Sequence, residues 1–184
     1  MKAFITGDSL AAGVGATSPE KGLAGRIATE LGKHNHVTLT NVAISGSRMK
    51  DIKIKPKQKQ DLTIIVASSN DLYHFTNKQK FETLTKEVLE LHSKLAKKVV
   101  LVGPADIGGT SAIPLFMKPL YKIARPKYAA IMKKTAAKHK NAKFVNPAEF
   151  SMKPYGPTEA ADGFHPNNSG HKYWADLILS ATHS

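Results

Sequence analysis

Residues 1–10 read Met1-Lys2-Ala3-Phe4-Ile5-Thr6-Gly7-Asp8-Ser9-Leu10, a short apolar run that stops at a glycine and is followed by an aspartate and a serine. Such a run, with turn residues at its end, is typical of a buried strand in a parallel sheet. The first ten residues therefore predict a strand, over Ala3–Thr6, that delivers a serine to the edge of a sheet. Four further runs follow the same plan: Val37–Asn41, Leu62–Ala67, Val99–Val102 and Ala142–Val145.

Helical stretches lie between these runs. In Lys78–Ala96 the apolar residues recur every three or four positions, which is the spacing of an amphipathic helix. We expect further helices over Gly22–Leu31 and Arg125–His139. A closing helix is expected within Pro166–Ala181, with the proline in its first turn, where a missing N–H costs nothing. Strands that alternate with helices predict an α/β sandwich.

The length and composition fit one globular domain. The chain has 184 residues, of which 41% are hydrophobic and 22% charged, and we expect a single domain over residues 1–184. It contains no cysteine, which excludes disulfides, thiolate metal sites and a cysteine nucleophile. No apolar stretch reaches the roughly 18 residues of a membrane span. The N-terminal apolar run is too short for a signal peptide, so we expect a cytoplasmic location.

The formal net charge of +13 would draw this chain to polyanions whatever its function. No ribonucleoprotein, zinc-finger or basic-zipper motif is present, so we expect no specific nucleic-acid partner. The segment from residue 50 to residue 59 is rich in lysine. It is either a patch for an anionic substrate or surface, or a solvated edge. Four of its lysines alternate with other residues and would share one side of an extended chain: Lys53, Lys55, Lys57 and Lys59.

Three polar residues form a candidate catalytic triad. A serine hydroxyl such as that of Ser9 needs a base to take its proton, and histidine, with an ordinary pKa near about 6.5, suits that role. His165 follows Asp162 by three residues in a stretch that predicts a tight turn, so both side chains can address one site. Asp162 would then hold the second ring nitrogen of the histidine. The alternative is that Ser9 caps a helix and that the other two residues belong to a surface turn.

Attack on an ester creates an oxyanion, which needs hydrogen-bond donors already aimed at it. Gly46 follows the second predicted strand and has no side chain to keep its backbone N–H away from a substrate oxygen. Asn70 follows the third predicted strand and can donate from its side-chain amide. Each residue alone is an ordinary turn residue, but the serine, the glycine, the asparagine and the aspartate-histidine pair together indicate a hydrolase site.

These blocks resemble in order and spacing the four signature blocks of the SGNH hydrolases, also called GDSL esterases and lipases. The resemblance spans almost the whole chain and rests on Gly7-Asp8-Ser9-Leu10, Gly46, Asn70-Asp71 and Asp162-Gly163-Phe164-His165. It implies a flavodoxin-like three-layer α/β/α sandwich with a central sheet of about five parallel strands. One departure is Ser68, which stands where the family usually has a glycine two residues before its asparagine.

The resemblance also implies the roles of the residues. Ser9 is the expected nucleophile, His165 the base and Asp162 the acid that orients it. The oxyanion hole is expected to combine the backbone N–H groups of Ser9 and Gly46 with the side chain of Asn70. The expected reaction is hydrolysis of carboxylic esters through an acyl-enzyme, with no metal and no cofactor.

The substrate is less constrained by the sequence. The family acts on short-chain esters, lysophospholipids, thioesters and sugar acetates, and a shared fold does not choose among them. Small acyl esters are our expectation. Two long connections, Ser47–Gln60 and Pro104–Pro119, start at the same sheet edge and are expected to form walls of the site. Four apolar residues of the second connection either line an acyl pocket or cover the edge of the core: Ile113, Leu115, Phe116 and Met117.

Two other interpretations are weaker. His34 and His36 are the only close histidine pair, but no carboxylate or cysteine lies near them, so we expect no metal site there. A basic binding module for nucleic acid or an acidic polymer, on a hydrolase scaffold without activity, would explain the charge but not the complete catalytic set. Labelling by a fluorophosphonate probe distinguishes the two classes, because the probe needs an activated serine.

Overall fold

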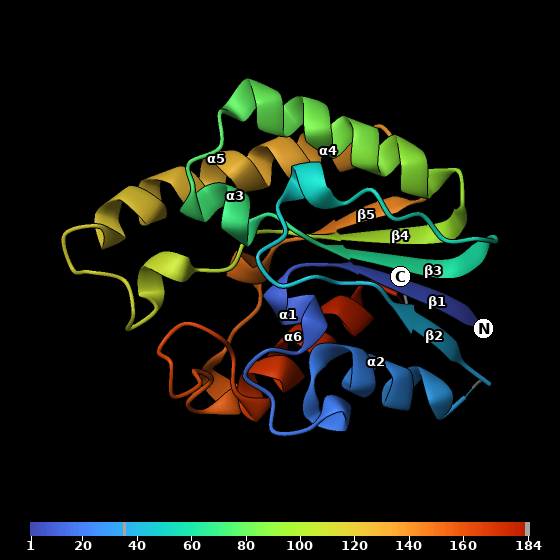
Figure 1. Cartoon of the computed structure of the whole chain (residues 1–184), viewed down its shortest axis with the longest axis horizontal. Coiled ribbons are helices and arrows are strands. Elements are labelled where there is room, and N and C mark those ends of the chain that lie inside the picture. The colour runs from blue at the N-terminus through green and yellow to red at the C-terminus, as the bar shows by residue number, and fades with distance from the viewer. Residues whose placement is uncertain (35, 183–184) are drawn as a thin grey trace.

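The computed structural model describes residues 1–34 and 36–182, and its five strands form one parallel sheet (Figure 1). The order of the strands across the sheet is β2-β1-β3-β4-β5, with every neighbouring pair parallel. This is the flavodoxin-like order, so the predicted fold class is confirmed. The strands are β1 (Lys2–Gly7), β2 (Thr38–Asn41), β3 (Gln60–Val66), β4 (Ala96–Val102) and β5 (Ala142–Val145).

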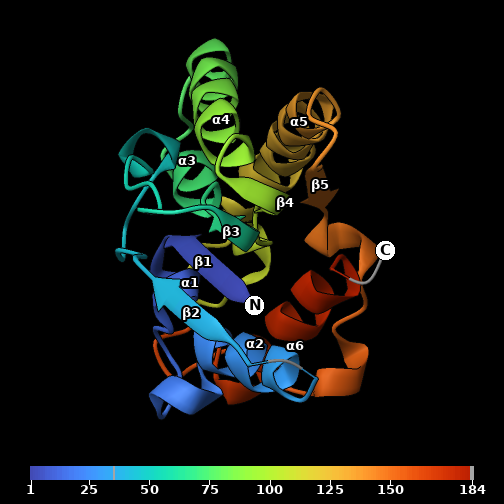
Figure 2. The ribbon, with the colours of Figure 1, turned by 90° about the vertical axis from the view of Figure 1, so that its right-hand side faces the viewer.

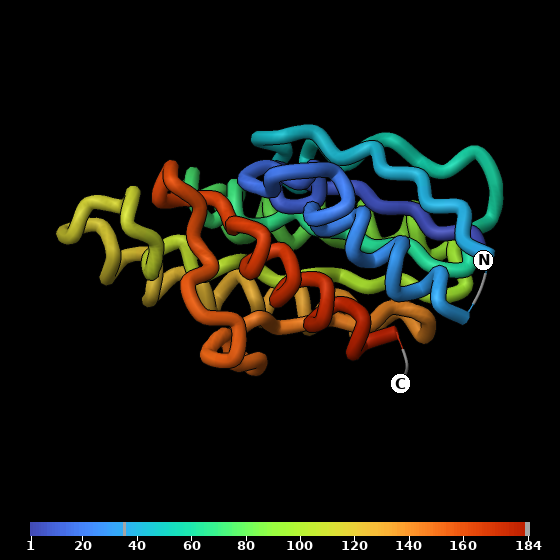
Figure 3. The backbone as a smooth tube through the Cα atoms, turned by 90° about the horizontal axis from the view of Figure 1, so that it is seen from below, coloured from blue at the N-terminus to red at the C-terminus, as the bar shows by residue number. Residues whose placement is uncertain are grey.

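Helices cover both faces of the sheet, as Figures 1 and 2 show. α4 and α5 lie on one face, and α2 and α6 lie side by side on the other, where Figure 3 shows them nearest the viewer. The short helices α1 and α3 follow β1 and β3 directly. The α-helices span α1 (Ser9–Ala12), α2 (Leu23–Gly32), α3 (Ser69–Tyr73), α4 (Lys78–Ser93), α5 (Lys118–Ala136) and α6 (Asn168–Ser180).

The core forms because the central strands are apolar on both sides. On β3, Leu62 and Ile64 point toward α2 and α6, whereas Ile65 points toward α4 and α5. All three side chains are buried. Side chains of a strand alternate between the two faces of its sheet, so a strand covered on both faces needs an unbroken apolar run. The same logic explains why the runs at β1 and β4 could be recognised in the sequence.

Two helix starts differ from those expected by two residues or more. α5 begins at Lys118 rather than Arg125, because Pro119 occupies its first turn and Pro126 lies within the helix. α6 begins at Asn168, so that Pro166 precedes the helix and does not lie in its first turn as expected. The reason is that the side chain of Asn167 caps the helix by accepting a hydrogen bond from the Gly170 N–H at 3.0 Å. Pro166 instead pairs with Glu159 in an isolated bridge. A proline in the sequence therefore marked the helix region but not its first residue.

Within the described residues, no helix is both long and apolar enough to cross a membrane.

Candidate active site

The turn after β1 places Ser9 at the carboxyl ends of the strands. It lies between β1 and β3, where the strand order of the sheet changes direction. Gly7 is required there, because a Cβ atom at this position would lie 2.2 Å from the Val66 carbonyl oxygen on β3. The Asp8 N–H then donates to that same carbonyl at 2.9 Å. The Asp8 side chain caps α1 by accepting a hydrogen bond from the Leu10 N–H at 3.0 Å. Ser9 is thus the first residue of a helix that starts at the carboxyl end of a strand, which is where ligands bind in such sheets.

The predicted turn around His165 forms and joins the aspartate to the histidine. Gly163 has φ +68°, a left-handed conformation that glycine adopts without strain. One carboxylate oxygen of Asp162 accepts the backbone N–H groups of Phe164 and His165, each at 2.9 Å. The other oxygen lies 2.6 Å from the His165 Nδ1. An Nδ1–H that donates to a carboxylate leaves the Nε2 of a neutral ring as a proton acceptor.

These contacts also hold the aspartate in its charged form. The hydrogen bond from the His165 side chain, together with the two backbone N–H groups, lowers the pKa of Asp162 to about 2. The carboxylate is therefore ionised over any ordinary working range of pH. It can keep the ring in one orientation and favour the imidazolium that forms when the ring takes a proton.

Ser9 and His165 line a single cavity of about 550 Å³ at this edge of the sheet. Asp162 lies behind the histidine and does not line the cavity. Asn70, from the first turn of α3, lines it as well. The structure therefore brings together three residues whose positions in the sequence are 61 and 95 apart. Part of the cavity wall is apolar and consists of Ile107, Phe150, Met152, Phe164 and Trp174.

The two further oxyanion candidates differ in their placement. The Asn70 Nδ2 donates one hydrogen bond to the Ser47 carbonyl at 3.0 Å, and an amide nitrogen carries a second hydrogen that can reach a ligand. Gly46 precedes Ser47 but is exposed and does not line the cavity. Ser68, the departure from the family pattern, has φ 179°, which lies outside the left-handed range that favours glycine. The serine therefore leaves Asn70 in the cavity wall.

The model of the GDSL-like lipase/acylhydrolase family matches residues 5–173. The chain belongs to this family. It is accordingly a carboxylic ester hydrolase of the GDSL type, in agreement with the activity expected from the sequence. A comparison with curated proteins finds no match to this chain.

Solved structures similar to this GDSL hydrolase share its fold over nearly their whole length. TesA has a TM-score of 0.77 at 18% identity, with 98% of this chain and 97% of that chain covered. A catalytic mutant of Axe2, an acetylxylan esterase from Geobacillus stearothermophilus, has a TM-score of 0.77 at 20% identity, with 97% and 92% covered. A member of the lipolytic G-D-S-L family from Veillonella parvula has a TM-score of 0.77 at 17% identity, with 100% and 98% covered.

The four apolar residues of the second connection, candidates for an acyl pocket or for a cover over the edge of the core, lie outside the cavity of the GDSL hydrolase. Ile113 is buried in the core beneath α4 and α5, and Met117 packs against the same cluster. Leu115 and Phe116 are 82% and 78% exposed. Of the connection that carries these four residues, only the first part, between Ala105 and Thr110, lines the cavity. The other long connection, Ser47–Gln60, contributes no lining residue, although its Ser47 carbonyl accepts the hydrogen bond from Asn70.

Several lining residues were missed in the sequence. Phe150 and Met152 come from the connection between β5 and α6, which carried no motif apart from the turn at its end. Arg125 brings a positive charge to the cavity. Its Nε donates to the Pro104 carbonyl at 3.0 Å, and its Nη1 lies 3.8 Å from an Asp106 carboxylate oxygen. Arginine on a long helix gives no local signal of a site, because only the packing of α5 determines where its side chain ends.

No metal centre is found among the described residues, which hold no group of three or more histidine, aspartate or glutamate side chains close enough to bind an ion. His34 and His36 are both exposed, and Asn35 between them lies outside the described residues.

The buried carboxyl of Asp8 leads to a prediction about the stability of the GDSL hydrolase. Burial raises the pKa of Asp8 from 3.8 to about 7. Between these values only the unfolded chain loses the proton, so rising pH favours unfolding, and above about 7 the loss of stability is complete. Asp8→Asn keeps an oxygen for the Leu10 N–H but cannot ionise. We expect this variant to be more stable than the parent at pH 8 by on the order of 1–4 kcal/mol, and by much less at pH 4, in urea unfolding.

Asp61→Asn serves as the control with the opposite sign. The hydrogen bond from Lys97 lowers the pKa of Asp61, so this carboxylate contributes stability that is present above its unfolded pKa and is lost at lower pH. Its removal should therefore cost stability at pH 8 and not add any. If Asp8→Asn changes the free energy of unfolding equally at both pH values, the pKa of Asp8 does not differ between the folded and the unfolded chain.

Proposed function

We propose that Ser9, His165 and Asp162 hydrolyse carboxylic esters through an acyl-enzyme. Ser9 Oγ attacks the ester carbonyl while His165 Nε2 takes its proton, and the imidazolium returns that proton to the leaving alcohol. Water then enters, gives a proton to the same nitrogen and attacks the acyl carbon, and the acid leaves as His165 returns that proton to Ser9 Oγ. The observation that carries this proposal is the 2.6 Å contact between His165 Nδ1 and Asp162, made by a histidine that shares one cavity with Ser9.

The oxyanion is proposed to be held by the side chain of Asn70 and the backbone N–H groups of Ser9 and Gly46. The N–H of Ser9 lies at the first residue of α1, where a helix has no acceptor of its own. Asn70 is supported by its place in the cavity wall and by the Ser47 carbonyl, which orients its amide. Gly46 has the weaker support, because it reaches the site only through its neighbour Ser47.

Asn70→Ala is expected to lower kcat for a chromogenic acyl ester by about 10²–10³-fold, with a smaller change in KM. The reason is that the amide would bind the oxyanion more strongly than the carbonyl of the bound ester. Steady-state kinetics measure both constants. Asn77→Ala, which removes an asparagine that caps α4 away from the cavity, is the control. An unchanged kcat in Asn70→Ala would exclude this side chain from the oxyanion hole.

Small acyl esters remain the proposed substrate class. The cavity, at about 550 Å³, has both an apolar wall and polar groups at the serine, which suits an ester with a short acyl chain. A lysophospholipid, a thioester or a sugar acetate would meet the same catalytic groups. Fluorophosphonate labelling and turnover of acyl esters test the proposed chemistry, through the Ser9 variant described in the Discussion.

The lysine run from residue 50 to residue 59 is proposed to be a solvated edge. After Asp51 the chain runs back to the start of β3, and Gln58 accepts a hydrogen bond from the Lys2 ammonium at 2.9 Å. Lys2 begins β1, five residues before Gly7 at the site, which in a strand is about 17 Å. This exceeds the Debye length of about 10 Å at 0.1 M salt, so the distal lysines have little influence on charge at the cavity.

A further inference from the structure

Five large apolar side chains that do not line the cavity are exposed at the end of the molecule where α5 begins. Leu115 and Phe116 are the most exposed, at 82% and 78%, and Ile123 follows at 61%. They come from the connection before α5, the first turns of α5 and the residue pair after α3. This end projects beyond the sheet in Figure 1. We call the group the apolar tip: Phe75, Leu115, Phe116, Leu120 and Ile123.

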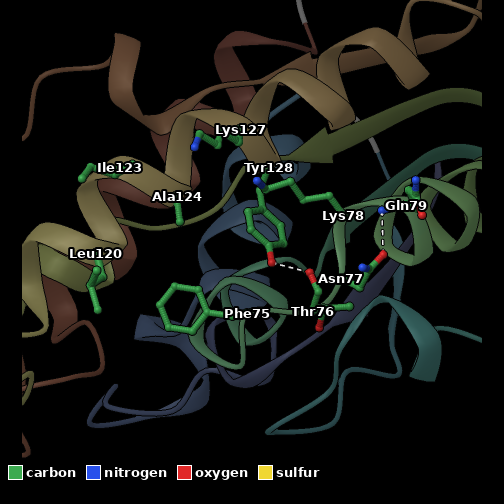
Figure 4. Close-up of a pocket in the computed structure, with 10 residues that line it drawn as sticks. All are labelled: Phe75, Thr76, Asn77, Lys78, Gln79, Leu120, Ile123, Ala124, Lys127 and Tyr128. Carbon is green, nitrogen blue, oxygen red and sulfur yellow. Dashed lines mark hydrogen bonds between the residues drawn. The ribbon is translucent and has the colours of Figure 1, made fainter.

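α5 explains why the tip has no partner inside the fold. One stripe of this helix, with Tyr121, Tyr128 and Met132, is buried in the core. That single stripe is all that a helix needs to pack on a sheet. Leu120 and Ile123 form a second apolar stripe, which faces away from the core and borders an open groove of about 420 Å³ (Figure 4).

Phe75 forms the opposite rim of this groove. Its backbone has φ +48°, a left-handed conformation that a bulky residue rarely adopts. Its ring stacks on Tyr121, with ring centroids 5.1 Å apart, and still remains 44% exposed. In Figure 4 the ring lies between the turn before α4 and the α5 residues. The fold thus holds an aromatic side chain at the surface in a strained turn instead of burying it.

The segment that carries most of the tip is basic. From residue 107 to residue 148 the sequence has nine lysine and arginine residues and no aspartate or glutamate. Lys78 and Lys127 line the groove, and Lys118 and Lys122 lie on the turns of α5 that carry Leu120 and Ile123. Within the described part of the chain, none of these four lysines takes part in an ion pair. These four positive charges beside the tip are therefore free to meet an anionic partner.

We propose that the apolar tip docks on an anionic lipid membrane surface. Apolar side chains flanked by unpaired lysines fit the boundary between acyl chains and negatively charged headgroups. There the burial of the apolar side chains and the attraction of the lysines to the headgroups both contribute to the binding free energy. A second copy of this chain is a poor occupant, because it would bring like charges together. The proposal goes beyond the proposed function and does not depend on the roles of Ser9, Asp162 or His165.

The test is co-sedimentation of the whole protein with vesicles. Vesicles of equimolar phosphatidylcholine and phosphatidylglycerol should bind it at least about 10-fold more strongly than phosphatidylcholine alone. Salt at 1 M, where the Debye length falls to about 3 Å, should weaken that binding. The triple variant Lys118→Gln, Lys122→Gln, Lys127→Gln should weaken it by about 10–100-fold. The matched control changes the same charge on another face: Lys53→Gln, Lys55→Gln, Lys57→Gln.

The apolar part is tested separately. Leu115→Ser with Phe116→Ser should lower binding to the anionic vesicles by about 10-fold or more. Ile54→Ser is the control, because Ile54 is 47% exposed but lies in the lysine run of residues 50–59. All these side chains are at the surface, so the unfolding temperatures should stay close to that of the parent, and their measurement identifies any variant that fails to fold.

Three outcomes would overturn the proposal. Equal binding to both kinds of vesicle would remove the role of charge. Equal losses in the triple variant and in its lysine control would show that net charge, and not this face, draws the protein to lipid. Binding that survives Leu115→Ser with Phe116→Ser, and that poly-glutamate abolishes, would show a surface that recognises acidic polymers by charge alone.

Discussion

Ser9→Ala is expected to lower kcat for ester hydrolysis by about 10⁴-fold or more and to abolish labelling by a fluorophosphonate probe. The substitution removes the hydroxyl that would carry the acyl group, and no other group at that position can form the covalent intermediate. The fold should be retained, because α1 is capped by Asp8 and not by Ser9. Turnover of a chromogenic acyl ester, labelling and urea unfolding measure the three expectations.

Ser69→Ala is the matched control for this experiment. Ser69 also lines the cavity and also begins a helix at a strand end, but its Oγ accepts a hydrogen bond from the Ala105 N–H at 3.1 Å. It should leave labelling intact. Substantial turnover by folded Ser9→Ala would rule out Ser9 as the nucleophile. Loss of labelling in Ser69→Ala, but not in Ser9→Ala, would show that the nucleophile is Ser69 on α3.

Asp162→Asn is expected to have the second largest effect, a decrease in kcat of about 10²–10⁴-fold. The amide has nearly the shape of the carboxylate but lacks its charge, which a pKa of about 2 maintains in the parent. It can also donate to His165 Nδ1, which would favour the tautomer whose Nε2 carries the proton and cannot act as a base. The side chain of Asp162 is 48% exposed, so water can replace part of its role, and we place the effect below that of Ser9→Ala.

Asp106→Asn provides the comparison, since Asp106 lines the cavity and its carboxylate lies near Arg125 rather than near the histidine. It should change kcat far less than Asp162→Asn. The pH profile gives a further readout, because raising the pH should not restore the activity of Asp162→Asn if the tautomer is the cause. A variant with parental kcat across the profile would show that another group orients His165.

The strands and the turns that carry Ser9 and Asp162 could be predicted because their causes are local. An apolar run covered on both faces of a sheet must be unbroken, and that requirement is visible in the four consecutive residues Val99 to Val102 of β4. The Asp162 turn forms from contacts within four residues, namely two backbone N–H groups and one ring nitrogen on a single carboxylate. Gly7 is an exception, because the requirement for glycine at this position arises from the Val66 carbonyl on another strand.

Helix starts were predicted less well where two local signals competed. Pro166 has the sequence features of a helix start, yet Asn167 supplies the cap and Pro166 pairs with Glu159. In α5, Pro119 and Pro126 are both compatible with a first turn, and packing of Tyr121 in the core selects the longer helix.

The sequence by itself determined the fold class and, to within one residue, the carboxyl ends of the strands, and it predicted the residues with the chemistry of an ester hydrolase, because each depends on neighbours along the chain. Only the tertiary structure decided which side chains wall the cavity. Leu115 and Phe116 belong to the surface, whereas Phe150 and Arg125 belong to the site. An apolar side chain in a long connection has no preferred face of its own. Its position follows from the path that the connection takes over the packed helices, and that path is set by contacts between residues far apart in the sequence.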